Sequence, residues 1–320
     1  MNGMVRTVMG EIPAEKMGNT SVHEHLTSAF SITPPEFIRD EQEFAIEQLH
    51  KAKESGLDTV IEVSACPRVK PDFIRYIAER SPVNIVACTG FYCAPWFTDE
   101  EKSYSIEQFL EHMLYEAEYG IEGSGLLPGV LKTGSFRPTI QPCEVRSLTA
   151  AGMAQKMTGL PLCVHSSTGS RYQQYLIEAA GADMEKVYFS HLESPTDREN
   201  RTLPMQIDYI ENTMKRGSYV SINGFCYPPY LDPNEPAEMV RQICERGYAH
   251  KMLLSLDWGW EFKNGKRNFS YQDRENLEPE VKARNWAFLM SYVVPFLHGY
   301  GIAESDLNLM LRDNVYKLFG

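Results

Sequence analysis

Eight short apolar runs recur along the chain, and a longer amphipathic stretch or a loop separates each run from the next. The runs are rich in β-branched residues and have the length of buried strands, whereas the stretches between them carry apolar residues at helical spacing. The predicted strands cover residues 20–23, 59–63, 84–89, 129–132, 162–165, 187–191, 219–223 and 252–257. The predicted helices cover residues 40–55, 105–119, 144–158, 170–180, 205–216, 236–246 and 281–299.

Strand and helix alternate at roughly 25–45 residues per unit, which is typical of a (β/α)8 TIM barrel. An open doubly wound sheet is the alternative, although such a sheet seldom contains eight repeats of this kind. No low-complexity linker divides the 320 residues. We therefore predict an α/β fold, a (β/α)8 TIM barrel that forms one domain over residues 1–320, with 1–19 as a lead-in and 306–319 as a closing helix.

The longest connection, residues 258–279, follows the eighth predicted strand. Long loops in compact domains usually carry function, and the loops that follow the strands of a TIM barrel surround its active site. We therefore predict that residues 258–279 form a lid over the site.

Charge and cysteine content limit the partners and the compartment. The chain has 31 basic and 43 acidic residues, a formal net charge of −12, which argues against nucleic acid or an anionic membrane as the main partner. The seven cysteines are odd in number and form no C-x-x-C pair, as in a reduced cytosolic protein. With no secretory signal and no stretch of about 18 apolar residues, we expect a cytoplasmic protein that acts on a small molecule. The protein could also form a homodimer.

An ionisable residue ends five of the predicted strands, and the first of them ends in two histidines, His23 and His25. Residues two apart in a strand point to the same face, so these two imidazoles can converge on one metal ion. The other strand ends are Lys132, His165, His191 and Asp257. Barrel enzymes place their catalytic residues at the carboxyl ends of the strands, so we predict that all six side chains share one site.

Four imidazoles and one carboxylate suit Zn²⁺, and also Mn²⁺ or Co²⁺. They exceed the three protein ligands of a typical catalytic zinc ion, and they suffice for two ions if an anionic group bridges them. Lys132 can supply that group. Burial beside cations disfavours an ammonium, and the neutral amine can react with CO2 to give a carbamate with two oxygens.

The motifs around these residues occur in a fixed order. They are G-E-I-P and G-N-T-S-V-H-E-H-L within residues 10–26, G-V-L-K at 129–132, V-H at 164–165, S-H at 190–191, L-D-W at 256–258 and L-R-D-N-V-Y-K-L-F at 311–319. In this order they resemble the opening, the carbamylated-lysine strand, the remaining ligand strands and the closing helix of the phosphotriesterase family, in the amidohydrolase superfamily. The resemblance extends over essentially the whole chain.

The resemblance implies a binuclear metal-dependent hydrolase. His23, His25 and Asp257 would bind the buried ion, and His165 and His191 the more exposed one. Carboxylated Lys132 and a hydroxide would bridge the two ions, and the hydroxide would attack the substrate. Asp257 would take a proton from the hydroxide and pass it towards the leaving group, with help from His191 or a water.

The substrate is predicted from the loops. The pair Phe91-Tyr92 matches the aromatic pair that lines the pocket of lactonase relatives, and arginines on loops around a metal site suit an anionic group. Residues 222–228 lack the arginine found in relatives that accept acyl-homoserine lactones, which argues against that class. We therefore predict a lactonase or esterase that acts on a small polar lactone, such as a sugar or sugar-phosphate lactone. The predicted substrate-binding residues are Tyr92, Arg137, Arg171, Trp258, Arg267 and Arg274.

Other functions remain open. Within the same family the chain can be a phosphotriesterase or an amide hydrolase that acts on N-acyl amino acids. A Schiff-base aldolase could use Lys132 to attack a carbonyl, but the four histidines and Asp257 would then have no reason to surround it. A metal-binding protein without catalysis is the third alternative.

Overall fold

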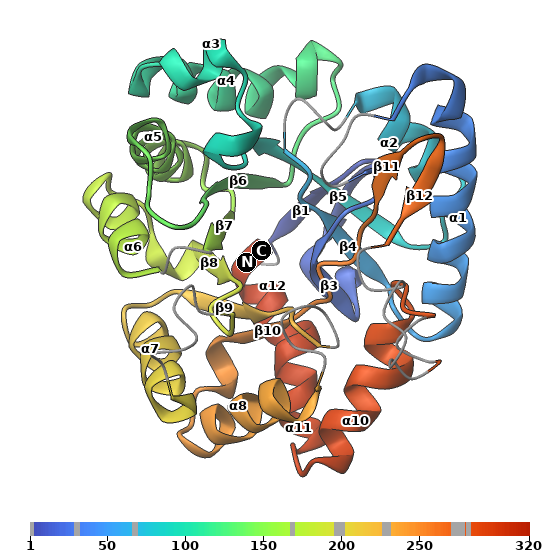
Figure 1. The fold of residues 1–320 in the computed structure, drawn as a ribbon, viewed down its shortest axis with the longest axis vertical. Coiled ribbons are helices and arrows are strands. Elements are labelled where there is room, and N and C mark those ends of the chain that lie inside the picture. Colours follow the sequence, from blue (N-terminus) through green and yellow to red (C-terminus); the bar gives the residue numbers. More distant parts are fainter. Residues whose placement is uncertain are drawn as a thin grey trace.

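The computed structural model describes residues 3–28, 33–65, 70–166, 170–194, 202–225, 232–269, 279 and 283–320. Eight parallel strands form its central sheet, and each strand pairs with the next one along the chain (Figure 1). They are β3 (Thr20–Glu24), β4 (Thr59–Glu62), β5 (Asn84–Gly90), β6 (Val130–Ser135), β7 (Leu162–Ser166), β8 (Val187–Ser190), β9 (Tyr219–Ile222) and β10 (Met252–Leu254). All eight predicted strands are confirmed, within a few residues at their ends.

The two edge strands of this sheet, β3 and β10, meet and close the barrel. The Asp257 amide donates to the His23 carbonyl at 3.0 Å, and the His25 amide donates to the Trp258 carbonyl at 3.1 Å. These hydrogen bonds lie just beyond the last residue of β10, so the barrel closes at the carboxyl ends of its strands. The TIM barrel is therefore confirmed.

A ring of helices covers the outside of the barrel (Figure 1). The helices between the strands are α1 (Ile38–Glu54), α2 (Pro71–Ala78), α3 (Asp99–Ser103), α4 (Ile106–Tyr119), α5 (Pro142–Thr158), α6 (Ser170–Ala179), α7 (Leu203–Lys215) and α8 (Asn234–Glu245). The last three are α10 (Val294–Gly299), α11 (Glu304–Asn308) and α12 (Asn314–Phe319), and α10 and α12 each continue a π-helical turn, at Leu289–Val293 and Leu309–Asp313. None of the described helices is long and apolar enough to cross a membrane.

The prediction of a helix over residues 281–299 is wrong at its start, because residues 283–287 form turns and not a helix. The Asn285 side chain accepts a hydrogen bond from the Ala287 amide at 2.8 Å. Such local side-chain acceptors compete with a helical backbone. The apolar spacing of the segment instead buries Trp286, which packs edge-on against Trp258 at 4.7 Å between ring centroids.

Two hairpins lie outside the barrel sheet. The predicted lead-in contains β1 (Met4–Thr7) and β2 (Gly10–Pro13), which pair antiparallel. The predicted lid begins with β11 (Glu261–Lys263) and β12 (Lys266–Asn268), also antiparallel. Asn264 and Gly265 join them with positive φ angles of 52° and 72°, as an Asn-Gly hairpin turn requires. Residues 270–278 of the predicted lid lie outside the described residues.

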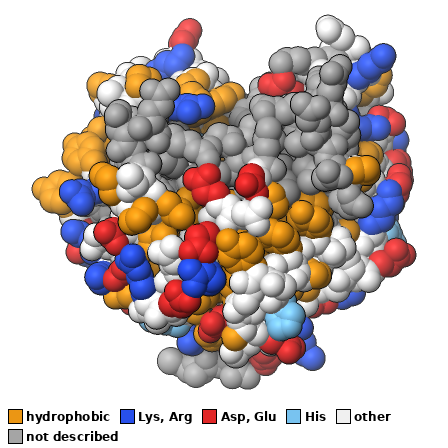
Figure 2. Space-filling view, turned by 60° about the horizontal axis from the view of Figure 1, so that its bottom comes forward, with side chains coloured by type: hydrophobic (Ala, Val, Ile, Leu, Met, Phe, Trp, Pro, Cys, Tyr) orange, Lys and Arg blue, Asp and Glu red, His pale blue; other side chains and the backbone are white. Residues whose placement is uncertain are grey.

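Apolar side chains fill the barrel interior and the space between barrel and helices. Tyr188, Val130 and Cys163 belong to the interior cluster, and Leu318 and Phe319 of α12 pack against it. Figure 2 shows one outer face, on which acidic and basic side chains are intermixed with hydrophobic ones. This face therefore presents no field of a single sign.

Asn314 ties the closing helix to the barrel, so we predict that Asn314→Ala is destabilising. The side chain is fully buried, and its Nδ2 donates to the Ala249 and Met252 carbonyls at 2.9 and 2.8 Å. Truncation leaves both acceptors without their donor, so the free energy of unfolding should fall by about 2–3 kcal/mol. Urea unfolding measures it, with the exposed neighbour Asp313→Ala as the control, expected to change it by less than about 0.5 kcal/mol. Equal effects of the two variants would contradict this role of Asn314.

Candidate metal centre

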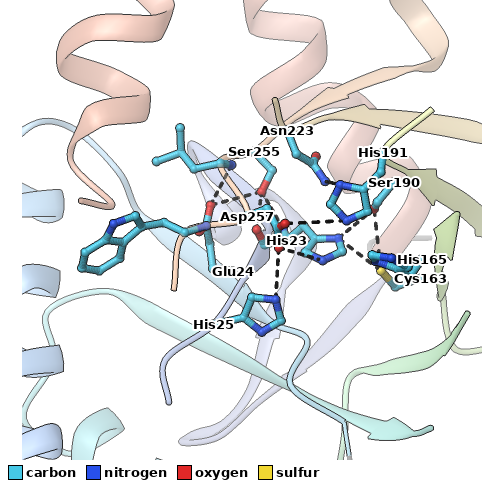
Figure 3. A network of polar contacts seen from close by, with 12 residues as sticks. His23, Glu24, His25, Cys163, His165, Ser190, His191, Asn223, Ser255 and Asp257 are labelled. Atoms are coloured by element: carbon cyan, nitrogen blue, oxygen red, sulfur yellow. Dashed lines mark hydrogen bonds and ion pairs between the residues drawn. The ribbon is translucent and has the colours of Figure 1, made fainter. Parts of the chain in front are cut away.

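The four predicted histidine ligands and Asp257 converge at the carboxyl ends of the strands (Figure 3). His23 lies in β3, His25 directly after it, and Lys132 in β6. His165 lies in β7, and His191 and Asp257 follow β8 and β10. Potential ligand atoms of His23, His191 and Asp257 lie within 4.8 Å of one another. The structure therefore brings together side chains from five strands that are far apart in the sequence.

The Asp257 carboxylate lies between three of the imidazoles. Its Oδ1 is 3.1 Å from Nε2 of His25 and 3.4 Å from Nε2 of His23. Its Oδ2 is 3.8 Å from Nε2 of His191. Burial raises the pKa of Asp257, but the imidazoles of His191 and His25 more than offset this, and the net pKa lies below the usual value. Asp257 is therefore an anion at neutral pH.

His165 and His191 complete the cluster. Their ring centroids are 4.5 Å apart, and the His191 ring lies 4.9 Å from that of His23. Both Nε2 atoms are buried, and neither has a hydrogen-bond partner among the described residues. A buried nitrogen without a partner is costly in a protein interior, whereas a divalent cation takes such a lone pair as a ligand.

Three of the imidazoles, those of His23, His165 and His191, are held in the neutral form that binds metal ions. Burial lowers the pKa of His23 well below its ordinary value, and Lys132 and His191 lower it further. Burial likewise lowers the pKa of His165 well below its ordinary value and that of His191 to about 4. The donor set of these three neutral imidazoles, the His25 imidazole and the Asp257 carboxylate therefore fits a metal centre.

Polar side chains behind the imidazoles fix their orientation. Nδ1 of His23 lies 2.7 Å from the Ser190 hydroxyl, and Nδ1 of His25 lies 2.7 Å from the Ser64 hydroxyl. With Nδ1 engaged, each ring presents Nε2 to Asp257. Outer hydrogen bonds of this kind are a regular feature of histidines that bind metals.

Lys132 lies at the centre of the cluster and is 0% exposed. Its Nζ is 3.4 Å from Nε2 of His23 and 3.4 Å from Sγ of Cys163. No carboxylate of the described residues lies within ion-pair distance of Nζ. A fully buried amine among imidazoles, without a paired anion, is the environment that the carbamate hypothesis requires.

Two residues of the cluster have strained backbone conformations. His191 and Asp257 have positive φ angles of 71° and 52°, a region that side chains other than glycine seldom adopt. Such conformations cost on the order of 1–3 kcal/mol each and persist only where the surrounding structure enforces them. The strain places both side chains beside His23, which a regular strand continuation would not do.

Three buried carboxylates beside the cluster are absent from the predicted set. They are Glu24, Glu62 and Glu193, all at most 1% exposed. Burial raises the pKa of all three, to about 7 for Glu24 and for Glu193. Each accepts backbone amides of a loop near the site. All three stand in or just after predicted strands, so the strand-end signal that revealed the ligands also marks these residues.

Of the predicted substrate-binding residues, Tyr92 lies at the cluster. Its hydroxyl is 3.4 Å from Nδ1 of His165, and its ring lies 4.8 Å from that of Trp96. Phe136 packs edge-on against Trp96 at 5.0 Å. These three aromatic residues form a wall beside His165, and the exposed Arg137 directly follows Phe136.

The other predicted substrate-binding residues lie elsewhere. Trp258 is 2% exposed and stacks on Phe269 within the core. Arg267 donates to Glu41 at 3.0 Å and covers the Phe44 ring at 4.2 Å, so a substrate would have to displace these contacts. Arg171 lines a cavity of about 410 Å³ that is otherwise formed by residues of α6 and α7 and by Arg216. Arg274 lies outside the described residues.

A parallel barrel with imidazoles, a carboxylate and a buried lysine at its strand ends is the framework of a TIM-barrel hydrolase with a metal-binding group. The chain belongs to the Phosphotriesterase family, whose sequence profile matches residues 3–319. A "Phosphotriesterase homology protein" of Mycobacterium tuberculosis is 28% identical over 337 residues, which cover 98% of this chain and 97% of the relative. A solved mutant of the organophosphorus hydrolase of Deinococcus radiodurans shares the fold, with a TM-score of 0.85, 24% identity and coverage of 100% and 98%.

More distant relatives over nearly the whole chain are hydrolases with different substrates. They include an "Aryldialkylphosphatase" of Saccharolobus solfataricus, 24% identical over 96% of both chains, and a "Phospho-furanose lactonase" of Mycoplasmopsis agalactiae, 25% identical over 97% of this chain and 89% of the relative. An "N-acetyltaurine hydrolase" of Xenopus tropicalis is 23% identical over 98% and 97%. The chain is thus a hydrolase.

The low pKa of His191 predicts that the metal-free protein loses stability in mild acid. Its pKa rises from about 4 in the folded chain to 6.5 on unfolding, so between these values the unfolded chain binds the extra proton and folding is disfavoured as pH falls. From pH 7 to pH 5, wild type should lose about 2 kcal/mol more of its free energy of unfolding than His191→Asn, which cannot titrate.

Urea unfolding of chelator-treated protein at the two pH values measures this difference. The control is His250→Asn, because His250 is an exposed histidine outside the cluster. It should behave as wild type does. A His191→Asn variant with the same loss as wild type would show that His191 is not buried in its neutral form.

Proposed function

We propose that the protein is a binuclear metal-dependent hydrolase that opens a lactone or cleaves a related ester. One observation carries the proposal: the buried Nε2 atoms of His165 and His191 have no hydrogen-bond partner among the described residues, and they lie beside an anionic Asp257 and the buried Lys132. An aldolase would need Lys132 but not this donor set. A structural site would not need buried nitrogens left open.

In this proposal His23, His25 and Asp257 would hold one divalent ion, and His165 and His191 would hold the other. Lys132, once carboxylated by CO2, would supply a further anionic ligand to the pair of ions. Zn²⁺ is the first choice, with Mn²⁺ or Co²⁺ as alternatives. Bound here, the ions would activate a water as the nucleophile and polarise the substrate oxygen.

Asp257 then handles the proton. Its low pKa keeps the carboxylate ionised at neutral pH, so it can accept a proton from the nucleophile and deliver it to the leaving group. His191, 3.8 Å from Oδ2, stays neutral because its pKa is lowered to about 4. Because the His191 ring is neutral, Oδ2 of Asp257 has no competing ion pair with it. Tyr92 and Trp96 form an apolar wall next to His165.

The substrate in this proposal is a small polar lactone with an anionic group, such as a sugar-phosphate lactone. The phospho-furanose lactonase relative supports this choice. Arg137 is the arginine best placed to bind the anion, since it is exposed directly after the aromatic wall of Tyr92, Trp96 and Phe136. Phosphotriesters and N-acyl amino acids are the competing substrates, in line with the other hydrolase relatives.

Lys132 provides the sharpest test of the metal centre. Protein produced with added Zn²⁺ and bicarbonate should contain two ions per chain by elemental analysis, and ¹³C-bicarbonate should give a carbamate signal by NMR. Lys132→Met should lose at least one ion and lower kcat by about 100-fold or more, because no anion remains between the ligands. Lys132→Glu, which supplies two carboxylate oxygens, should retain both ions. Wild type without two ions, or Lys132→Met with both, would refute the binuclear centre.

The substrate class is tested by Arg137→Ala in a screen of phosphorylated sugar lactones, neutral lactones, N-acyl amino acids and an aryl phosphotriester. We expect KM for the phosphorylated lactone to rise about tenfold, the effect of one lost charged hydrogen bond. KM for a neutral lactone should not change. Arg75→Ala, on the outer helix α2, is the control. If neutral and phosphorylated lactones respond alike, the anionic substrate is ruled out.

A further inference from the structure

Glu24, the middle residue of the His-Glu-His motif, contacts the segment that carries Asp257. Its side chain points to the opposite face of β3 from His23 and His25, as the strand period requires. Oε1 accepts the Leu256 amide at 3.0 Å, and Oε2 accepts the Trp258 amide at 2.9 Å. The carboxylate therefore holds the residues on both sides of Asp257 (Figure 3).

Asp257 needs such support because its backbone is strained. Its φ angle is 52°, and a strained residue keeps this conformation only if its neighbours are fixed. The Asp257 amide donates to the His23 carbonyl, and the Trp258 carbonyl accepts from the His25 amide. Together with the two hydrogen bonds to the Glu24 carboxylate, these make four hydrogen bonds between residues 23–25 and residues 256–258.

Arg284 holds the same segment from the outside. It is 2% exposed, and its Nη2 donates to the Leu256 carbonyl. Burial raises the pKa of Glu24 to about 7, and the hydrogen bonds to Glu24 and the positive charge of Arg284 oppose this rise. Leu256 is therefore fixed at its amide by a carboxylate and at its carbonyl by a guanidinium. The segment 283–287, which the sequence predicted as helix, leaves the helical conformation where it supplies this arginine.

We propose that Glu24 is a positioning residue: with Arg284 it clamps the strained backbone of Asp257, and so sets where the Asp257 carboxylate lies between His23 and His25. Glu24 touches neither the substrate nor the imidazole face. The effect of this clamp on catalysis rests on the proposed function, but its effect on the backbone of residues 256–258 does not.

The proposal requires two acceptor atoms on residue 24. The two oxygens bind different amides, and Oε1 also lies 3.1 Å from the Ser255 hydroxyl. Glutamine has the same size but only one acceptor. In either amide orientation, its NH2 group would face a backbone N–H donor at Leu256 or Trp258. Glu24→Gln therefore breaks the clamp without opening a cavity.

The first readout is amide hydrogen exchange in the metal-free protein, which does not depend on any activity. Glu24→Gln should lower the protection of residues 256–258 by about tenfold or more relative to wild type, because one buried amide loses its acceptor. The matched control is Glu116→Gln. Glu116 is a buried carboxylate of α4 that accepts the Thr89 hydroxyl and the Glu122 amide, away from Asp257. The Glu116→Gln variant should leave the protection of residues 256–258 unchanged.

The second readout is kinetic and uses the metal-loaded enzyme. Glu24→Gln should lower kcat by about 100-fold, since a shift of about 1 Å in a catalytic group has an effect of this size. KM should change less than about threefold, because Glu24 does not touch the substrate. Glu116→Gln should retain the wild-type kcat even if its melting temperature falls as far as that of Glu24→Gln. A purely structural Glu24 would lower stability without this split between kcat and KM.

The outcomes separate this proposal from the proposed function. Unchanged protection and unchanged kcat in Glu24→Gln would overturn the clamp. Faster exchange at 256–258 in a protein that hydrolyses none of the screened substrates would support the clamp and reject the proposed function. If Glu24→Gln does not fold, Glu24→Asp keeps the charge but is one methylene too short to reach both amides. Full protection of 256–258 in Glu24→Asp would likewise overturn the clamp.

Discussion

The hydrogen bonds between β3 and the segment after β10 close the barrel, and the geometry of the site depends on them. They place His23 and His25 next to Asp257, although the first and last strands are far apart in the sequence. A three-residue cluster of this kind cannot exist in an open sheet, because the edge strands would lie on opposite sides. An ion that bound all three side chains would therefore also stabilise the closed barrel.

The candidate site could be predicted from the sequence because each of its residues lies at the end of a buried apolar run or directly after it. In a parallel barrel all strand ends meet on one face, so Lys132, His165 and Asp257 could be grouped without knowing any distance. The eight strands themselves were predicted from their short, β-branched apolar runs. The apolar pattern did not predict the turns at residues 283–287, where the local Asn285 turn and the burial of Arg284 outweigh the apolar spacing. Tertiary contacts of this kind leave no periodic signal.

The residues that would bind the substrate are harder to predict, because a loop residue has no strand register that fixes the direction of its side chain. Arg267 and Arg171 have the charge that an anionic substrate needs, but Arg267 contacts Glu41 of α1 and Arg171 lines a cavity along α6 and α7. Both contacts join elements that are distant in sequence. From the cluster, ring contacts lead from Tyr92 through Trp96 to Phe136, and Arg137 is the next residue in the chain.

The carboxylates around the site differ in environment, and the difference assigns their roles. Asp257 faces imidazoles, which lower its pKa despite burial. Glu24 and Glu193 face backbone amides, and burial raises the pKa of each to about 7. In the proposed function the carboxylate that binds metal and accepts the proton is anionic at neutral pH, which the environment of Asp257 favours. Glu24 and Glu193 instead accept backbone amides of loops beside the site. The partners of each buried acid thus distinguish a candidate ligand from a carboxylate that holds the backbone.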